Sequence, residues 1–187
     1  AHARLVGHLI DHYTGAGEQT HEARLADAQT AIAVFERQGD RAGIARAWRL
    51  ITYLHGSALR FGAMSDAADR LVEHALLAGD QRLAARGAVG YAQAALYGPT
   101  PVPAAIDRCH AVLEQAGDDR ATRAYIERFV AHISAFDGRF DEARALTTAW
   151  WDEVVRSEGR ERHTLVQELV DAQYAEMFAA MPTPAYL

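Results

Sequence analysis

The chain has 187 residues, of which 50% are hydrophobic and 24% charged, and its formal net charge is −6. This balance is typical of a folded globular protein rather than a disordered one, and a nucleic-acid-binding surface would need clustered basic residues. The single cysteine, Cys109, excludes an internal disulfide and a cysteine-ligated zinc site. No apolar run approaches the ~18 residues of a membrane span. We therefore expect a cytoplasmic protein without membrane contact.

Good helix formers dominate the chain, and no alternating strand pattern is present, so we predict an all-α fold. In chain order, the predicted helices cover 3–14, 20–38, 41–60, 65–78, 81–97, 102–115, 120–136, 140–157 and 161–180. In the third of these, Ile44, Trp48 and Ile51 recur near the helical period of 3.6 residues. Ser65 and Asp66 are interpreted as the capping residues that open the fourth.

Glycine-containing turns recur along the chain with a period near 40 residues. One set has intervals of 40, 38 and 42 residues, at Gly39, Gly79, Gly117 and Gly159. A second set falls between them, at Gly62, Gly98 and Gly138. This period is typical of a helical solenoid whose unit is helix, short turn, helix and longer turn. We predict a single helical-repeat domain over 1–187 with about nine helices in about four repeats, cut from a longer protein because the chain starts without Met.

Two of the second helices in these repeats begin with a similar frame. One reads Gly62-Ala63-Met64-Ser65-Asp66-Ala67, and the other reads Gly138-Arg139-Phe140-Asp141-Glu142-Ala143. The glycine suits a tight turn, the large apolar residue fills the joint between two helices, and the alanine lets the helices approach closely. This Gly-x-Phe-x-x-Ala frame resembles the tetratricopeptide repeat, although the period is longer and the family's Leu-Gly is absent between Trp48 and Tyr53. The resemblance implies a right-handed superhelix of antiparallel helix pairs.

A narrower resemblance concerns residues 97–106, which read Tyr-Gly-Pro-Thr-Pro-Val-Pro-Ala-Ala-Ile, and residues 138–146. Both are similar to the repeat region of large bacterial signalling proteins, which join a nucleotide-binding ATPase module to a nucleotide cyclase or a helix-turn-helix transcription regulator. The resemblance covers roughly residues 20 to 160. It implies a non-catalytic scaffold for protein–protein or interdomain contacts in signal transduction or transcription regulation.

No catalytic or metal-binding group is predicted, and we do not expect an enzyme or a cofactor. A phosphate-binding loop with its lysine is excluded because Lys is absent. His8 and His12 have a spacing that suits a metal, but a surface helix near a terminus is the preferred interpretation. Cys109 is interpreted as a small buried hydrophobe because its neighbour His110 faces another direction on a helix. For the pair Trp150-Trp151, packing is favoured over a role as a partner hot spot.

The first helix of each repeat lines the inner face of a tetratricopeptide superhelix. Aligning Ala45, Ala85 and Ala124 places one stripe of side chains on each of three such helices. The predicted groove residues are Arg46, Arg49, Tyr53, Arg86, Gln93, Tyr125, Arg128 and His132. Arginine forks and aromatic faces suit a carboxylate-bearing peptide of a protein partner or of another domain of the parent chain. The alternatives are a sensor for a small anionic metabolite and a merely solvated face; nucleic-acid contact is not expected.

Overall fold

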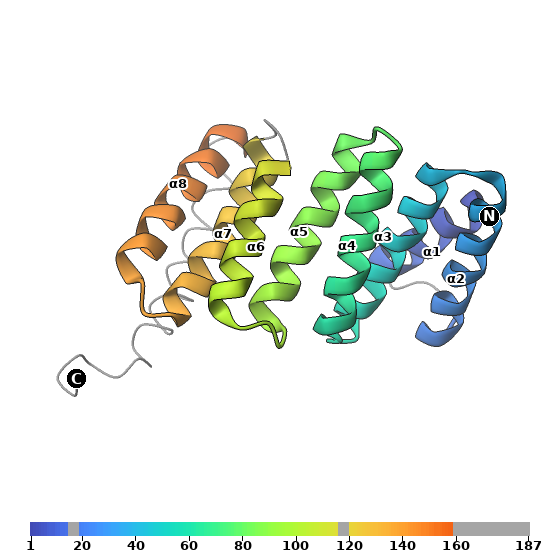
Figure 1. The fold of residues 1–187 in the computed structure, drawn as a ribbon, viewed down its shortest axis with the longest axis horizontal. Coiled ribbons are helices and arrows are strands. Elements are labelled where there is room, and N and C mark those ends of the chain that lie inside the picture. Colours follow the sequence, from blue (N-terminus) through green and yellow to red (C-terminus); the bar gives the residue numbers. More distant parts are fainter. Residues whose placement is uncertain (15–18, 116–119, 159–187) are drawn as a thin grey trace.

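The computed structural model describes residues 1–14, 19–115 and 120–158, and all its regular elements are helices (Figure 1). They are α1 (His2–Thr14), α2 (His21–Gln38), α3 (Arg41–Ser57), α4 (Phe61–Leu77), α5 (Gln81–Tyr97), α6 (Val102–Gln115), α7 (Arg120–Phe136) and α8 (Phe140–Glu158). The described residues contain no strand, so the predicted all-α class is confirmed. The predicted helix over 161–180 and the turns at Gly117 and Gly159 lie outside the described residues.

Within the described residues, two Gly-Asp pairs, Gly39-Asp40 and Gly79-Asp80, each end one helix and begin the next. Gly39 and Gly79 adopt left-handed backbone angles, with φ of 67° and 71°, which glycine tolerates without a Cβ clash. The following aspartate accepts a hydrogen bond from a backbone N–H of the next helix. Asp40 accepts from Gly43 at 2.8 Å, and Asp80 accepts from Leu83 at 3.0 Å. These N-caps satisfy donors that the first turn of a helix otherwise leaves without partners.

The turn between α3 and α4 differs from the prediction. Helix α4 begins at Phe61, so Ser65 and Asp66 lie inside it and do not open it. Gly62 is helical as well, and the left-handed residue of the turn is Leu59, with φ of 56°. The glycine in the sequence therefore marked the wrong residue, because a backbone turn of this type also forms around a strained non-glycine residue.

Four turns share one hydrogen-bond pattern, which replaces the predicted alternation of short and longer turns. The residue after each left-handed position donates its N–H to the carbonyl five residues earlier, at 2.9 Å in the turns that contain Gly39, Leu59, Gly79 and Gly138. This is the Schellman geometry that commonly closes a helix. The first three positions are 20 residues apart, since 59 − 39 = 79 − 59 = 20. Leu59, not Gly62, is thus equivalent to Gly138.

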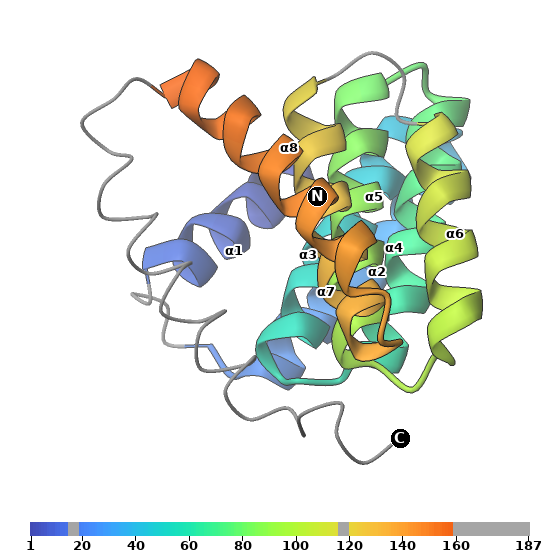
Figure 2. The same cartoon turned by 90° about the vertical axis from the view of Figure 1, so that its left-hand side faces the viewer.

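The helices stack in two layers in chain order. Helix α3 contacts α5, and α5 contacts α7; these three form the inner layer. Helices α2, α4 and α6 pack on the other side, each against the neighbouring inner helices, and α8 packs on α7. When the molecule is viewed along its long axis, α1 and α8 lie on one side of the inner layer, and α4 and α6 lie on the opposite side (Figure 2). Together they border the face on which the candidate site lies.

The core depends on small residues that let the layers approach closely. A Cβ built on Gly87 of α5 would lie 2.7 Å from Cγ2 of Val72 on α4, so any larger residue there would force the side chains between the two helices to shift. Cys109 is fully buried, and burial raises the pKa of its thiol to about 12, which confirms the packing interpretation. None of the described helices combines the length and the apolar character needed to cross a bilayer.

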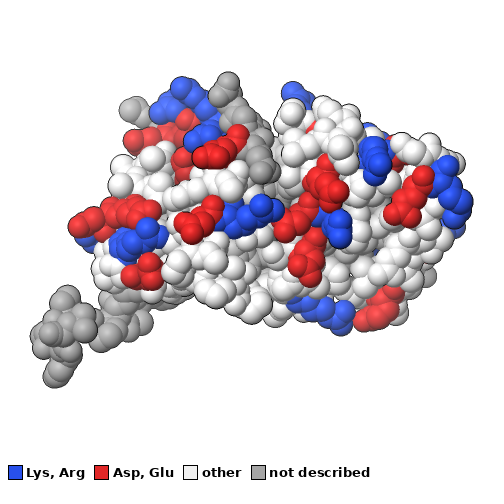
Figure 3. All heavy atoms as spheres, viewed as in Figure 1, with Lys and Arg blue, Asp and Glu red and all other residues white. Residues whose placement is uncertain are grey.

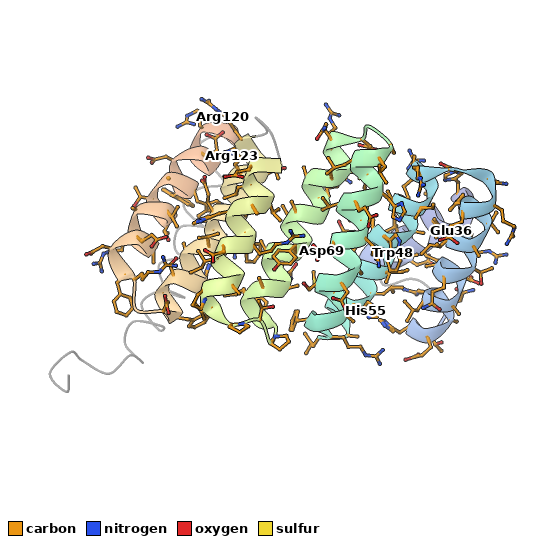
Figure 4. All side chains as sticks on the ribbon, in the orientation of Figure 1. Glu36, Trp48, His55, Asp69, Arg120 and Arg123 are labelled. Carbon is orange, nitrogen blue, oxygen red and sulfur yellow. The ribbon has the colours of Figure 1, made fainter. Side chains whose placement is uncertain are left out.

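The outer layer is tied together by polar contacts on the face opposite the candidate site. Asp69 of α4, labelled in Figure 4, accepts a hydrogen bond from Arg108 of α6 at 2.6 Å. The same guanidinium lies 5.3 Å from the ring centroid of Tyr91 on α5, so one arginine links three helices. Basic and acidic side chains are interspersed over the face drawn in Figure 3, without a continuous patch of either sign.

Candidate functional site

Two adjoining cavities hollow the inner layer. The larger one, here the central cavity, has a volume of about 450 Å³. It is lined by Arg49, Thr52, Tyr53, Met64, Leu71, Arg86, Val89, Gly90, Gln93, Thr122 and Tyr125. These residues come from α3, α5 and α7, with two from α4. The cavity therefore spans the whole inner layer and reaches the helix behind it.

The second cavity, here the N-terminal cavity, has a volume of about 320 Å³. It is lined by His2, Leu5, Val6, Leu9, Arg46, Arg49, Asp80, Arg82, Leu83 and Arg86. Helix α1 forms one wall, and the N-terminal halves of α3 and α5 form the other. Arg49 and Arg86 line both cavities, so the two are parts of one groove that follows the axes of α3 and α5.

The groove carries an excess of positive charge, although the chain as a whole is acidic. Its arginines are Arg46, Arg49, Arg82 and Arg86, and the carboxylate among the lining residues is that of Asp80. That carboxylate is already occupied as the N-cap of α5. In the described part of the chain, Arg82 and Arg86 form no ion pair, so their charge is not neutralised by a neighbour.

Of the eight predicted groove residues, the structure brings six to the cavities. Arg49, Tyr53, Arg86, Gln93 and Tyr125 line the central cavity, and Arg46 lines the N-terminal one. The guanidinium of Arg49 lies 5.4 Å from the ring centroid of Tyr53, a cation–π distance that places the charge beside the aromatic face.

Arg128 and His132 line neither cavity. The Arg128 guanidinium lies 5.3 Å from a ring centroid of Trp150 and 5.7 Å from that of Phe129. His132 Nδ1 lies 2.7 Å from the Arg128 carbonyl oxygen, and burial lowers the pKa of this imidazole. Arg128 lies away from the cavities because α8 packs on α7, and the Arg128 guanidinium stacks on its Trp150.

Sequence reasoning missed the contribution of α1 and of α4. Leu5 and Leu9 are four residues apart on one face of α1, a spacing that indicates contact with a neighbouring helix. The alignment that located the stripe covered three first helices and did not include α1. Met64 and Leu71 line the cavity from behind the inner layer, a position that no single-helix pattern indicates.

The other residues considered from the sequence have structural partners. His8 is 5% exposed, and its Nε2 lies 3.0 Å from Oδ2 of Asp27 on α2, so it fastens α1 to the next helix. The side chain of His12 is outside the described residues. Within the described part of the chain, no three His, Cys, Asp or Glu residues are grouped as metal ligands would be. Trp150 is 4% exposed and Trp151 is half-buried, as packing predicts.

Comparison with known proteins adds neither a family nor a function to this geometry. Neither a protein-family model, nor a curated protein, nor a solved structure matches the chain.

Proposed function

We propose that the chain is a non-catalytic, tetratricopeptide-like scaffold of about four repeats, and that its groove holds an extended acidic segment. The segment belongs to a protein partner or to another domain of the parent chain, in a bacterial signalling or transcription-regulatory protein. The stacking of helix pairs in order and the turn period support the repeat architecture. Stacked repeats of this kind create long concave surfaces that suit peptides.

The arginine excess of the groove is the observation that carries this proposal. Four arginines and one capped aspartate give a positive local potential, and such a potential concentrates anionic partners. Arginine forks also bind carboxylates in a bidentate manner. Because the two cavities adjoin through Arg49 and Arg86, the groove is longer than one cavity and favours an extended ligand.

A small anionic metabolite is the second candidate ligand, and the central cavity favours it specifically. Its volume of about 450 Å³ lies within the ~300–1,000 Å³ of typical small-molecule pockets. In that case the chain is a sensor that passes the binding event to an effector domain. The two candidates share the arginines and differ in whether the N-terminal cavity contributes to affinity.

The test is a selection from a random decapeptide library on the purified chain. Enrichment of Asp- and Glu-containing peptides is expected, and it should be lost in the double variant Arg49→Glu with Arg86→Glu. The control is Arg70→Glu with Arg144→Glu, which changes the net charge equally at exposed positions outside the groove, 61% and 63% exposed. Selection of acidic peptides that survives in the groove variant, or no acidic enrichment on the wild-type chain, contradicts the proposal.

A further inference from the structure

We propose that the central cavity is a specificity pocket for one large apolar side chain, preferably aromatic, and that Arg49 and Arg86 hold a carboxylate next to it. This inference rests on the proposed function and adds a sequence requirement to it: the bound segment carries an aromatic residue adjacent to an acidic one. Acidity alone would leave the depth of the cavity unused.

The floor of the central cavity is apolar and lies behind the inner layer. Met64 and Leu71 of α4 are 2% and 1% exposed, so the cavity reaches between the inner helices to the core. Gly90 keeps the passage open: a Cβ at this position would lie 3.1 Å from Cγ2 of Thr52 on the facing helix. A polar group placed at this floor would lose its hydration without gaining a partner, whereas an apolar side chain gains burial.

The rim of the cavity favours an aromatic ring over an aliphatic chain. Tyr125 lines the cavity and is 46% exposed, so its ring is accessible to a ligand at the rim. Tyr53 stands on the α3 side with the Arg49 guanidinium over its ring. A ring that enters beside these two tyrosines can contact aromatic side chains and the Arg49 cation, and both kinds of group interact favourably with an aromatic ring.

The shared arginines argue for a peptide rather than a free aromatic acid. A carboxylate bound between Arg49 and Arg86 lies where the two cavities meet. A peptide that continues from there enters the N-terminal cavity, where Arg46 and Arg82 can bind further acidic residues. A free aromatic acid would fill the central cavity and leave these two arginines without a partner.

The experiment compares two fluorescein-labelled decapeptides of alternating Glu and Ala, one with a central Phe and one with Ala at that position. Fluorescence anisotropy at low and physiological ionic strength gives both affinities. The Phe peptide should bind about ten- to hundredfold more tightly, the ratio expected for burying one large apolar side chain. Both affinities should fall as salt rises, because the arginine contribution is screened.

Two variants of the cavity should reduce the preference for the Phe peptide to about threefold or less. Val89→Phe fills the cavity, and Tyr125→Ala removes an aromatic ring from its rim at a position that is 46% exposed and outside the buried core. The matched control is Phe136→Ala, which removes another exposed aromatic side chain of α7, 59% exposed, at a position that lines neither cavity. Circular dichroism spectra verify that each variant is folded.

The outcomes separate this inference from the proposed function. Equal, salt-sensitive binding of the two peptides overturns the aromatic pocket and leaves the acidic groove intact. Binding of neither peptide overturns both. If free 3-phenylpropionate binds as tightly as the Phe peptide, the pocket belongs to a small molecule and the peptide requirement is wrong.

Discussion

Replacing Leu59 by glycine should stabilise the protein, although it removes a large hydrophobic side chain. Leu59 has φ of 56°, a left-handed conformation that costs a residue with a Cβ about 1–2 kcal/mol. Its side chain is 74% exposed and loses little burial when removed. Glycine gives back part of the gain, about 0.4–1 kcal/mol, because its unfolded chain is more flexible. The difference between the midpoints of these two ranges gives an expected net increase in the free energy of unfolding of about 0.8 kcal/mol, and the extremes of the ranges give about 0 to 1.6 kcal/mol.

Urea unfolding followed by circular dichroism at 222 nm measures this increase as a higher midpoint with an unchanged slope. The matched control is Gly79→Ala in the equivalent turn, where φ is 71° and no atom lies within 4 Å of the position that the alanine Cβ would take. Only the backbone angle opposes that alanine, so it should destabilise by about 1 kcal/mol. If Leu59→Gly lowers the midpoint, the left-handed turn at Leu59 does not favour glycine as the equivalent turn at Gly79 does, and the prediction is wrong.

Three further changes test the packing and the titration of the fold. Gly87→Ala should destabilise by about 1–3 kcal/mol in urea unfolding, since its Cβ would press on Val72 at 2.7 Å; a neutral result would mean that α4 and α5 are further apart. Ile126→Ala should cost about 2–5 kcal/mol, because Ile126 is fully buried, and a cost below about 1 kcal/mol would contradict its core position. Burial lowers the pKa of His55 and His132 below the usual 6.5, so folding favours their neutral forms. Stability should be complete above pH ~6.5 and should fall as the pH drops from there towards the lowered pKa values, and a melting temperature that is flat over this interval would contradict it.

Most helix boundaries could be predicted from the sequence because most of the turns contain residues that typically end or begin a helix. The bounds of α5, α6 and α7 agree with the predicted ranges, where Asp80 and the proline-rich segment around Pro101 are clear markers. The start of α4 was placed four residues too late, at residue 65 instead of Phe61. The turn there is made by backbone hydrogen bonds around Leu59, and no residue type announced it. Gly62, one residue inside the helix, then supplied a false signal.

The groove could be predicted only as far as the repeat is regular. Aligning equivalent helices located Arg49 and Arg86 because both lie within the regular stack of α3 and α5. The alignment failed for Arg128, where α8 supplies Trp150 as a stacking partner, and the sequence of α7 alone does not reveal this contact. Neither could the alignment include α1, whose wall of the N-terminal cavity depends on how it docks at the end of the stack.

The uniform turn spacing also accounts for the length of the groove. Each inner helix has 17 residues and is therefore about 25 Å long, because an α-helix rises 1.5 Å per residue. A helix of this length presents several turns to the inner face, enough for two cavities one after the other along α3 and α5. Helix α1 covers the N-terminal halves of α3 and α5. It is held there by His8, which pairs with Asp27 of α2, and by His2, which pairs with Asp40 in the turn after α2. The lining of the central cavity includes no residue of α1, and this cavity has the apolar floor and the exposed Tyr125. The apolar floor of the central cavity and the arginines of the N-terminal cavity consequently follow one another along the same two helices, with Arg49 and Arg86 between them.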